Sequence, residues 1–497
     1  MVRRLGALSV LLALVMGSAP LLGQAPTPAH PRELRFTPRP FVVPAAEPYR
    51  HQLANGVVVY VVEDHALPLV DVALALRAGD YLDPADGVGT AGLTAAMLLR
   101  GGTTSLPPDA FDERADLLGA QLSSTAGSVR AGATLACPSW VLEEALDLFF
   151  DMLRAPRFDE ARLQAAKSNL LASFAQRNDD AADVLDREWD YLLYGPDHYL
   201  SRQLTAARLA AVGRERLAAF HRRYWQPRGM VLAISGDVDT KALLAGLERR
   251  FTGWTPGEPA PWPPPAPAQA LVPGLYHVEK ATPQAKVAIG HLTFARRGWD
   301  DPDAFAAIVM GELLGGSGPS SRIGGRLRTA EGIAYHASAG VGVGDTFPGE
   351  LRISLESANA TVGRAVELAL AEVARLRRET PSGEEVRQIE RSLVDSFPYL
   401  FDSAEKIAGR FAEDEYLGRP HTFWRDYRAR IEQVTPEQVR RIAERVLHPE
   451  QALVLVVGPW REMTGVGGQA SAPARGPFAG AVHHLPPRDP ASQEPQR

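Results

Sequence analysis

Two apolar runs near residue 60 have the spacing of strands, and the segments that follow them have the spacing of helices. Gly56 to Glu63 and Val70 to Arg77 predict strands. Apolar residues then recur every three to four positions, which predicts helices at 89–100, 107–118, 139–154, 159–177 and 180–194. A last apolar run, Met230 to Ser235, predicts the strand that closes this half of the chain.

The second half of the chain repeats the first. In the first half the repeated positions are Leu209, Val212, Leu217, Phe220, Pro227 and Gly236. Their counterparts, 222 positions later throughout (209 to 431, 236 to 458), are Ile431, Val434, Val439, Ile442, Pro449 and Gly458. A proline and a glycine in register with four apolar positions indicate an internal duplication.

A proline-rich stretch separates the two copies. Residues 255–273 predict a stiff, extended linker between domains at 49–254 and 274–462. In each copy strands come first, helices next, and a late strand returns to the sheet. The predicted fold class is α+β, with two homologous α/β-roll domains in which helices pack on one face of an antiparallel-rich sheet.

Both ends of the chain differ in composition from these domains. Residues 1–25 have the basic start, short apolar run and small residues of an export signal, which predicts a secreted protein of the bacterial periplasm. No segment is long and apolar enough to predict a transmembrane anchor. Residues 26–48 predict an extended arm, and residues 463–497 a disordered tail in which His483 and His484 are solvated.

Composition narrows the chemistry further. A net charge of −6 without a dense basic stripe argues against nucleic acid as a partner. The single cysteine, Cys137, excludes an intramolecular disulfide and a cysteine-rich zinc site. It ends an apolar run and is interpreted as a buried, inert thiol. His198 is interpreted as a residue of a structural turn.

Four segments at the start of the first domain occur in a familiar order: 53–60, the strand ending at Ala78-Gly79, 87–93, and 97–103. They resemble the opening of the pitrilysin/insulinase family of zinc metallopeptidases, the inverted zincins. Among its members, the chain resembles the alpha subunit of mitochondrial processing peptidase and bacterial heterodimeric homologues. The family carries His-x-x-Glu-His just before the last segment, and a third zinc ligand, a Glu, farther along.

In this chain the positions of that motif are Gly92, Ala95 and Ala96. Their spacing puts them on one helix face, but glycine and alanine offer no lone pair to a metal. The position of the downstream Glu falls in 170–173, ending at Ser173, where there is no carboxylate. We therefore expect no metal or other cofactor bound by this chain. Close helix packing is an adequate explanation of the two alanines.

The second domain keeps another part of the family pattern. Ser321 to Tyr335 resembles the segment whose Arg, and the Tyr seven residues later, hold the substrate carbonyl and stabilise the oxyanion. The corresponding residues are Arg328 and Tyr335. A guanidinium and a phenol are suitable donors to developing negative charge. The alternative is an arginine in a surface salt bridge and a packed tyrosine.

The resemblance implies a non-catalytic subunit that is inactive alone. It would pair with a homologous zinc-bearing subunit, enclose an unfolded peptide between clamshell halves, and supply Arg328 and Tyr335 in trans. Two alternatives stay open: a structural or assembly protein, and a peptide-binding protein without a role in catalysis.

Overall fold

The computed structural model describes residue 30 and residues 41–268, 270–316, 318–464 and 481–496. Contacts divide the chain into two units, Met1–Val42 and Val43–Arg497, and the helices and strands named below belong to the second. The predicted export signal and most of the predicted arm lie outside the described residues. Within the described ranges, no helix has the length and apolar character needed to cross a membrane.

The first half of this unit, residues 43–254, is built on a six-stranded sheet. The strands are β1 (Arg50–Gln52), β2 (Val58–Glu63), β3 (Leu69–Leu76), β4 (Gln121–Ala126), β5 (Ala131–Pro138) and β6 (Val231–Gly236), in the order β1-β2-β6-β3-β5-β4. The helices are α1 (Thr90–Arg100), α2 (Pro108–Leu117), α3 (Leu142–Arg154), α4 (Glu160–Phe174), α5 (Ala181–Tyr194), α6 (Ala206–Ala211), α7 (Arg214–Tyr224) and α8 (Thr240–Phe251).

The second half begins at residue 274 and has a six-stranded sheet of its own. Its order is β10-β12-β8-β13-β7-β14, from β7 (Gly274–Glu279), β8 (Gln284–Leu292), β10 (Ala334–Val341), β12 (Glu350–Ala358), β13 (Leu453–Gly458) and β14 (Val482–Leu485). A small parallel pair joins β9 (Phe294–Ala295) to β11 (Val343–Gly344). The helices are α9 (Pro302–Gly311), α10 (Arg322–Gly324), α11 (Val362–Arg378), α12 (Gly383–Ser396), α13 (Ala404–Leu417), α14 (Phe423–Glu432), α15 (Pro436–Val446) and α16 (Trp460–Thr464).

Apart from one edge strand, the two sheets share one topology, as the repeat in the sequence predicts. The central strand, β6 or β13, pairs in parallel with β2 or β7 and antiparallel with β3 or β8. The shift of 222 relates α7 to α15 (214 to 436) and β6 to β13 (231 to 453) at both ends of each element. The last residue of β6, Gly236, has to be glycine, because a Cβ there would lie 2.0 Å from the carbonyl oxygen of Leu69.

One edge strand differs between the sheets, and it corrects the prediction for the tail. Where the first sheet has β1 antiparallel to β2, the second has β14 parallel to β7. The prediction of a disordered tail over 463–497 is therefore wrong for residues 481–496, which add a strand to the sheet. His483 stacks on Tyr276, and His484 contacts His277, so the two histidines are not simply solvated.

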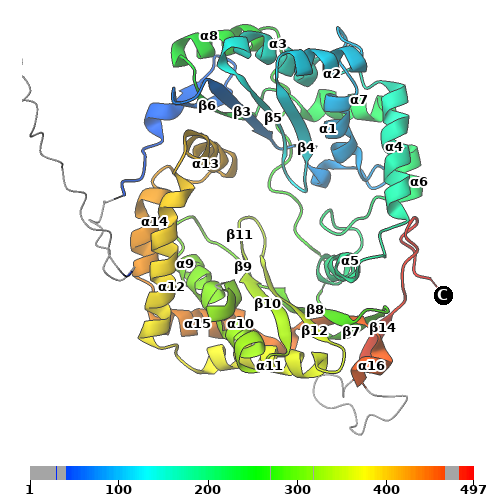
Figure 1. Cartoon of the computed structure of the whole chain (residues 1–497), viewed down its shortest axis with the longest axis vertical. Helices are drawn as coiled ribbons and strands as arrows, with labels where there is room; N and C mark the ends of the chain where they lie inside the picture. The colour runs from blue at the N-terminus through cyan, green and yellow to red at the C-terminus, as the bar shows by residue number, and fades with distance from the viewer. Residues whose placement is uncertain (1–29, 31–40, 269, 317, 465–480, 497) are drawn as a thin grey trace, which may run out of the picture. The chain divides into compact units, whose positions relative to one another are not determined.

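Each half has one helix that packs on the sheet of the other half. Figure 1 draws α5 and α13 between the two sheets. Helix α13, from the second half, packs on β2, β3 and β6 of the first sheet, and α5 packs on β8 and β13 of the second. The two helices are themselves counterparts in the repeat, each preceded by a capping side chain, Asp180 or Ser403.

This exchange gives both faces of a sheet something to pack against. Along β2, Val59 and Val61 belong to the core of the first half, whereas Tyr60 between them contacts Phe411 of α13. The hydroxyl of Tyr60 donates to Glu415, which also pairs with Arg50 at 3.0 Å. On the second sheet, Trp189 of α5 is fully buried in a cluster with strand residues of β7, β8 and β13.

Candidate functional site

Helix α1 carries the positions of the zinc motif and has a well-defined start. The buried carboxylate of Asp83 accepts hydrogen bonds from the backbone N–H groups of Gly89 and Ala91, at 2.7 and 2.8 Å. Burial raises the pKa of Asp83 to about 7. The helix packs beside β4, the outermost strand of the first sheet.

The face of α1 that corresponds to the motif has only a glycine and two alanines. Gly92 and Ala96 are half-buried, and Ala95 is completely buried in the core of the first half. A Cβ built on Gly92 would meet no atom within 4 Å, so the chain leaves open space there. Ser173 on α4 is exposed, and its hydroxyl donates to the carbonyl of Leu170 in its own helix.

Metal-binding side chains do not gather elsewhere in the part of the chain that the structure describes. Among those residues, no group of three or more His, Cys, Asp or Glu is placed to hold a metal ion. The thiol of Cys137 is buried, which raises its pKa to about 11, as expected for an inert cysteine.

Arg328 and Tyr335 do come together. Arg328 lies in the π-helical segment Gly325–Ala330, and Tyr335 is the second residue of β10. The guanidinium carbon of Arg328 lies 4.9 Å from the centroid of the Tyr335 ring, a cation–π distance. Both side chains are exposed, Tyr335 by 78%. The alternative of a packed tyrosine therefore does not describe this site.

The turn between the two residues is built to bring them together. Gly332 has a left-handed backbone (φ 66°), which reverses the chain between the helical segment and β10. The backbone N–H of Ile333 donates to the carbonyl of Leu327, and the Ser357 hydroxyl of β12 donates to the carbonyl of Ile333. Upstream, Arg322 pairs with Glu385 of α12. The pair thus stands on a supported segment at the edge of the second sheet.

A cavity that the sequence did not predict lies between the halves. Its volume is about 490 Å³, and its aromatic lining comes from both halves and from the linker: Tyr199, Trp262, Trp299, Phe347 and Tyr416. Arg296 stacks on Trp299 and pairs with Asp345, and Arg77 stacks on Trp262. Sequence could not reveal it, because these residues are far apart along the chain and each is an ordinary aromatic in its own segment.

His198 has the structural role that the sequence predicts. Its Nε2 lies 2.9 Å from the carbonyl oxygen of Pro265 in the linker, and its ring packs on Tyr194 and Tyr199. It therefore holds the linker against the turn after α5.

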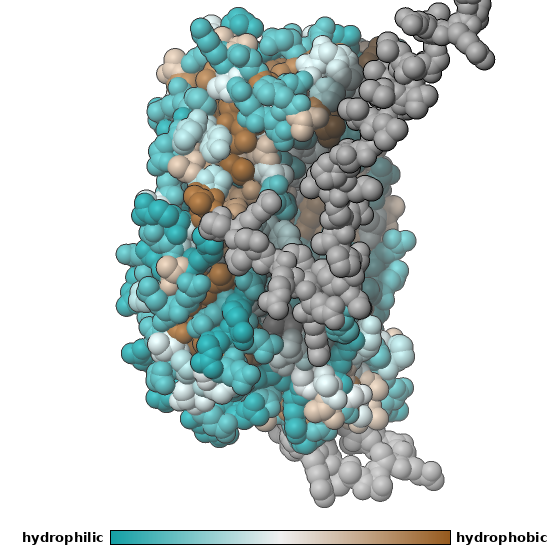
Figure 2. Space-filling model, turned by 60° about the vertical axis from the view of Figure 1, so that its left-hand side comes forward, coloured by the Kyte–Doolittle hydropathy of each residue, from teal (hydrophilic) through white to brown (hydrophobic). Residues whose placement is uncertain are grey.

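The face drawn in Figure 2 is mostly hydrophilic outside the grey atoms, with smaller hydrophobic patches between.

Comparison with known proteins agrees with this architecture. Residues 58–189 match the family model described as "Insulinase (Peptidase family M16)", and residues 211–393 match "Peptidase M16 inactive domain". An uncharacterised zinc protease of Streptomyces coelicolor is 25% identical over 326 residues, covering 64% of this chain and 69% of that protein.

Solved structures are similar over most of the chain. The peptidase M16 inactive domain from Pseudomonas fluorescens has a TM-score of 0.74 and 24% identity, covering 86% of this chain and 99% of that one. The periplasmic protease PqqL from Escherichia coli has a TM-score of 0.70 and 16% identity, covering 87% and 50%. With both domain models matched in order and the fold shared, the chain belongs to the insulinase (M16) peptidase family.

Proposed function

We propose that this chain is the non-catalytic subunit of a heterodimeric zinc metallopeptidase, secreted into the bacterial periplasm. It binds no metal itself, and it pairs with a homologous subunit that carries His-x-x-Glu-His. Its own contribution is the wall of the chamber that holds an unfolded peptide, together with Arg328 and Tyr335.

One observation carries the proposal: Arg328 and Tyr335 form an exposed pair, whereas the motif face of α1 has no metal ligand. A guanidinium and a phenol can donate to the oxyanion that forms when water attacks a peptide carbonyl. Zinc chemistry also needs an activated water, which this chain cannot supply from Gly92, Ala95 and Ala96. Arg328 and Tyr335 are incomplete as a catalytic site without a metal, and a metal site lacks these two donors. The partner's metal therefore complements this pair.

Two features of the fold support a peptide as substrate. Strand β4 pairs only with β5 among the described strands, so its other edge can accept an extended peptide by strand addition. The aromatic cavity between the halves can accept bulky side chains of such a peptide. Both features suit an unfolded chain better than a compact protein surface.

The test begins with the purified chain. We expect no stoichiometric zinc by elemental analysis and no cleavage of a fluorogenic unfolded peptide. Adding a homologous chain with His-x-x-Glu-His, such as one encoded beside this one, should produce chelator-sensitive cleavage. One tightly held zinc per chain, or cleavage by this chain alone, would overturn the proposal. Peptide binding without cleavage in the assembled pair would favour the peptide-binding alternative, and assembly without either would favour a structural protein.

A further inference from the structure

The C-terminal segment, residues 481–496, connects the two halves, and we call it the strap. Its first residues form β14, which pairs with β7 from Val482 opposite Leu275 to Leu485 opposite Val278. The residues after β14 leave the second sheet and reach the first half. The strap therefore has one anchor on each half.

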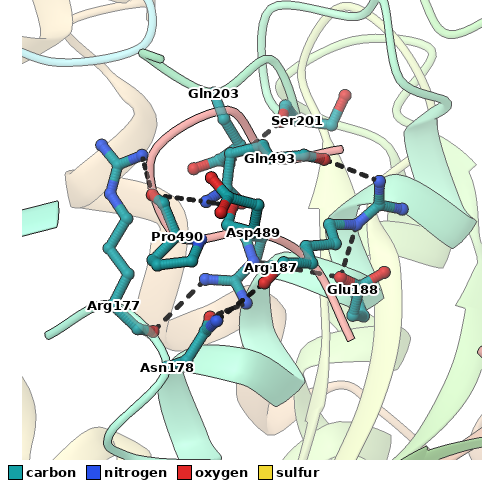
Figure 3. Close-up of polar contacts among 10 residues, drawn as sticks. Arg177, Asn178, Arg187, Glu188, Ser201, Gln203, Asp489, Pro490 and Gln493 are labelled. Atoms are coloured by element: carbon teal, nitrogen blue, oxygen red, sulfur yellow. Dashed lines mark hydrogen bonds and ion pairs between the residues drawn. The ribbon is translucent and has the colours of Figure 1, made fainter. Parts of the chain in front are cut away.

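The anchor on the first half is polar, as Figure 3 shows. The Nε of Arg488 lies 2.6 Å from Oε1 of Glu188, a residue of α5 that is almost completely buried. The guanidinium of Arg488 also stacks on Tyr191, at 4.2 Å from the ring centroid. Asn178 donates to the carbonyl of Arg488, and the N–H of Ala206 donates to the carbonyl of Ala491.

The strap buries little apolar surface. Val482 and Leu485 are only partly buried, His483 and His484 are exposed, and Gln493 is the only buried residue among 481–496. Apart from the pair of Arg488 with the buried Glu188, the polar contacts of the strap lie near water and contribute little each, because water competes for the same groups. An element held in this way belongs to the parts of a protein that open before the rest unfolds.

The anchor on the second half is a pair of histidines. Nδ1 of His277 lies 2.9 Å from Nδ1 of His484, and Nε2 of His277 lies 2.8 Å from the carbonyl oxygen of Gly458. A carbonyl only accepts, so Nε2 of His277 carries the proton. In the neutral ring Nδ1 is then bare and accepts from Nδ1–H of His484. This hydrogen bond needs one of the two facing nitrogens to be without a proton.

The surroundings of His277 decide how the pair responds to acid. Besides His484 on β14, the charged group that faces it is Glu279 on β7, at 3.6 Å. Helix α16 contributes the ring of Trp460, and β13 contributes the carbonyl of Gly458. Burial lowers the pKa of His277, and this outweighs the opposite effects of the hydrogen bond to the Gly458 carbonyl and of Glu279. The docked state therefore prefers neutral His277 and loses stability as the pH falls below about 6.5, the ordinary histidine pKa.

From this geometry we propose that the strap is a pH-sensitive latch. When both rings are protonated, two N–H groups face each other, and β14 detaches from β7. The other strands of both sheets stay folded, since the buried residues of the two cores do not include the strap. Detachment exposes the edge of β7, a row of backbone groups that can pair with another strand. This inference does not depend on the proposed peptidase role.

Hydrogen exchange of the full chain, followed by mass spectrometry and corrected for its intrinsic pH dependence, tests the latch. Between pH 7.5 and 5.5 we expect exchange in 274–279 and in the β14 part of the strap, 481–485, to rise by about tenfold or more, the effect of losing a hydrogen bond of ordinary net strength. Exchange in β2 and β6 should not change. Equal protection of the strap at both pH values would overturn the proposal.

Two neighbouring histidines on β14 provide a matched pair of variants. His484→Phe keeps a ring beside Trp460 but cannot form a hydrogen bond to His277. Its β14 should therefore exchange fast at both pH values, without the step in exchange between pH 7.5 and 5.5. His483→Phe keeps the stack on Tyr276 and should retain the step. Arg488→Met should speed exchange of 486–496 at both pH values. A pH step that persists in His484→Phe would show that other groups cause it and would overturn the histidine latch.

Discussion

At the scale of single residues, the proposed function depends on Arg328 and Tyr335. We expect Arg328→Ala and Tyr335→Phe to leave folding and assembly intact, because both side chains are exposed. Peptide cleavage by the reconstituted pair should fall by about 10²–10³-fold, the usual cost of losing one oxyanion donor. The loss should appear mainly in kcat, because the interaction strengthens only as charge develops.

The matched control is Tyr399→Phe, since Tyr399 is a tyrosine of similar exposure (69%) outside the pair. It should cleave at the wild-type rate. Arg328→Lys should not restore full activity, because an ammonium cannot reproduce the planar guanidinium fork. If the two assembled chains cleave peptide at the full rate with both Arg328 and Tyr335 replaced, this chain provides only chamber wall or scaffold.

The bare motif face of α1 gives a second prediction at this scale. Gly92→His should change the free energy of unfolding by no more than about 0.5 kcal/mol, since its Cβ meets open space. Ala95→Glu should lower it by about 3 kcal/mol, because Ala95 is completely buried and a carboxylate there lacks a partner. Urea unfolding followed by circular dichroism measures both changes.

The triple change Gly92→His, Ala95→Glu and Ala96→His should therefore not restore zinc-dependent cleavage by the chain alone. Ser173 supplies no carboxylate as a third ligand, and a new zinc site would also need groups that orient its ligands. An Ala95→Glu variant as stable as the original chain would contradict this, because it would show that the core around α1 can accommodate a glutamate.

At the scale of elements, the exchanged helices α5 and α13 join the halves. Trp189 of α5 is completely buried against the second sheet, and its Nε1 donates to Glu350 of β12 at 3.0 Å. Trp189→Ala should lower the free energy of unfolding by about 3–5 kcal/mol, the usual cost of deleting a buried aromatic. The control is Trp140→Ala, 72% exposed, which should change it by less than about 0.5 kcal/mol. A loss below about 1 kcal/mol at Trp189 would mean that α5 is a minor contact.

The elements also show which parts of the structure the sequence could predict. Helices and strands of the core have apolar periods, so their positions follow from the pattern, and the repeat of 222 residues locates α15 and β13 from α7 and β6. The resemblance of 321–335 to the family segment, rather than the spacing alone, predicted that Arg328 and Tyr335 act together. Helix exchange could not be predicted, because the pattern of α5 specifies an apolar face but not the sheet that covers it. Strand β14 was missed because four residues in a Gly- and Pro-rich region have no measurable period.

At the scale of the whole molecule, exchange of α5 and α13 predicts that the two halves, residues 43–464, unfold together. Each sheet has one face covered by a helix from the other half, and Glu415 of α13 pairs with Arg50 and accepts from Tyr60 across the boundary. Opening either half thus exposes apolar surface of both. We expect one calorimetric transition, with calorimetric and van't Hoff enthalpies that agree, despite a length typical of several domains.

Producing the two halves as separate chains tests whether each needs the helix that the other half supplies. Residues 43–254 without α13, and residues 274–496 without α5, each lose the cover of one sheet face, so neither should fold when produced alone. Produced together, they should associate and recover the far-ultraviolet circular dichroism of the intact chain. Two resolved transitions in the intact protein, or a stable isolated half, would show that the two halves are independent domains whose folding does not need the exchanged helices. The strap is not the reason for this cooperativity, because deleting residues 481–496 leaves both exchanged helices in place. A chain without the strap should therefore still unfold in one transition.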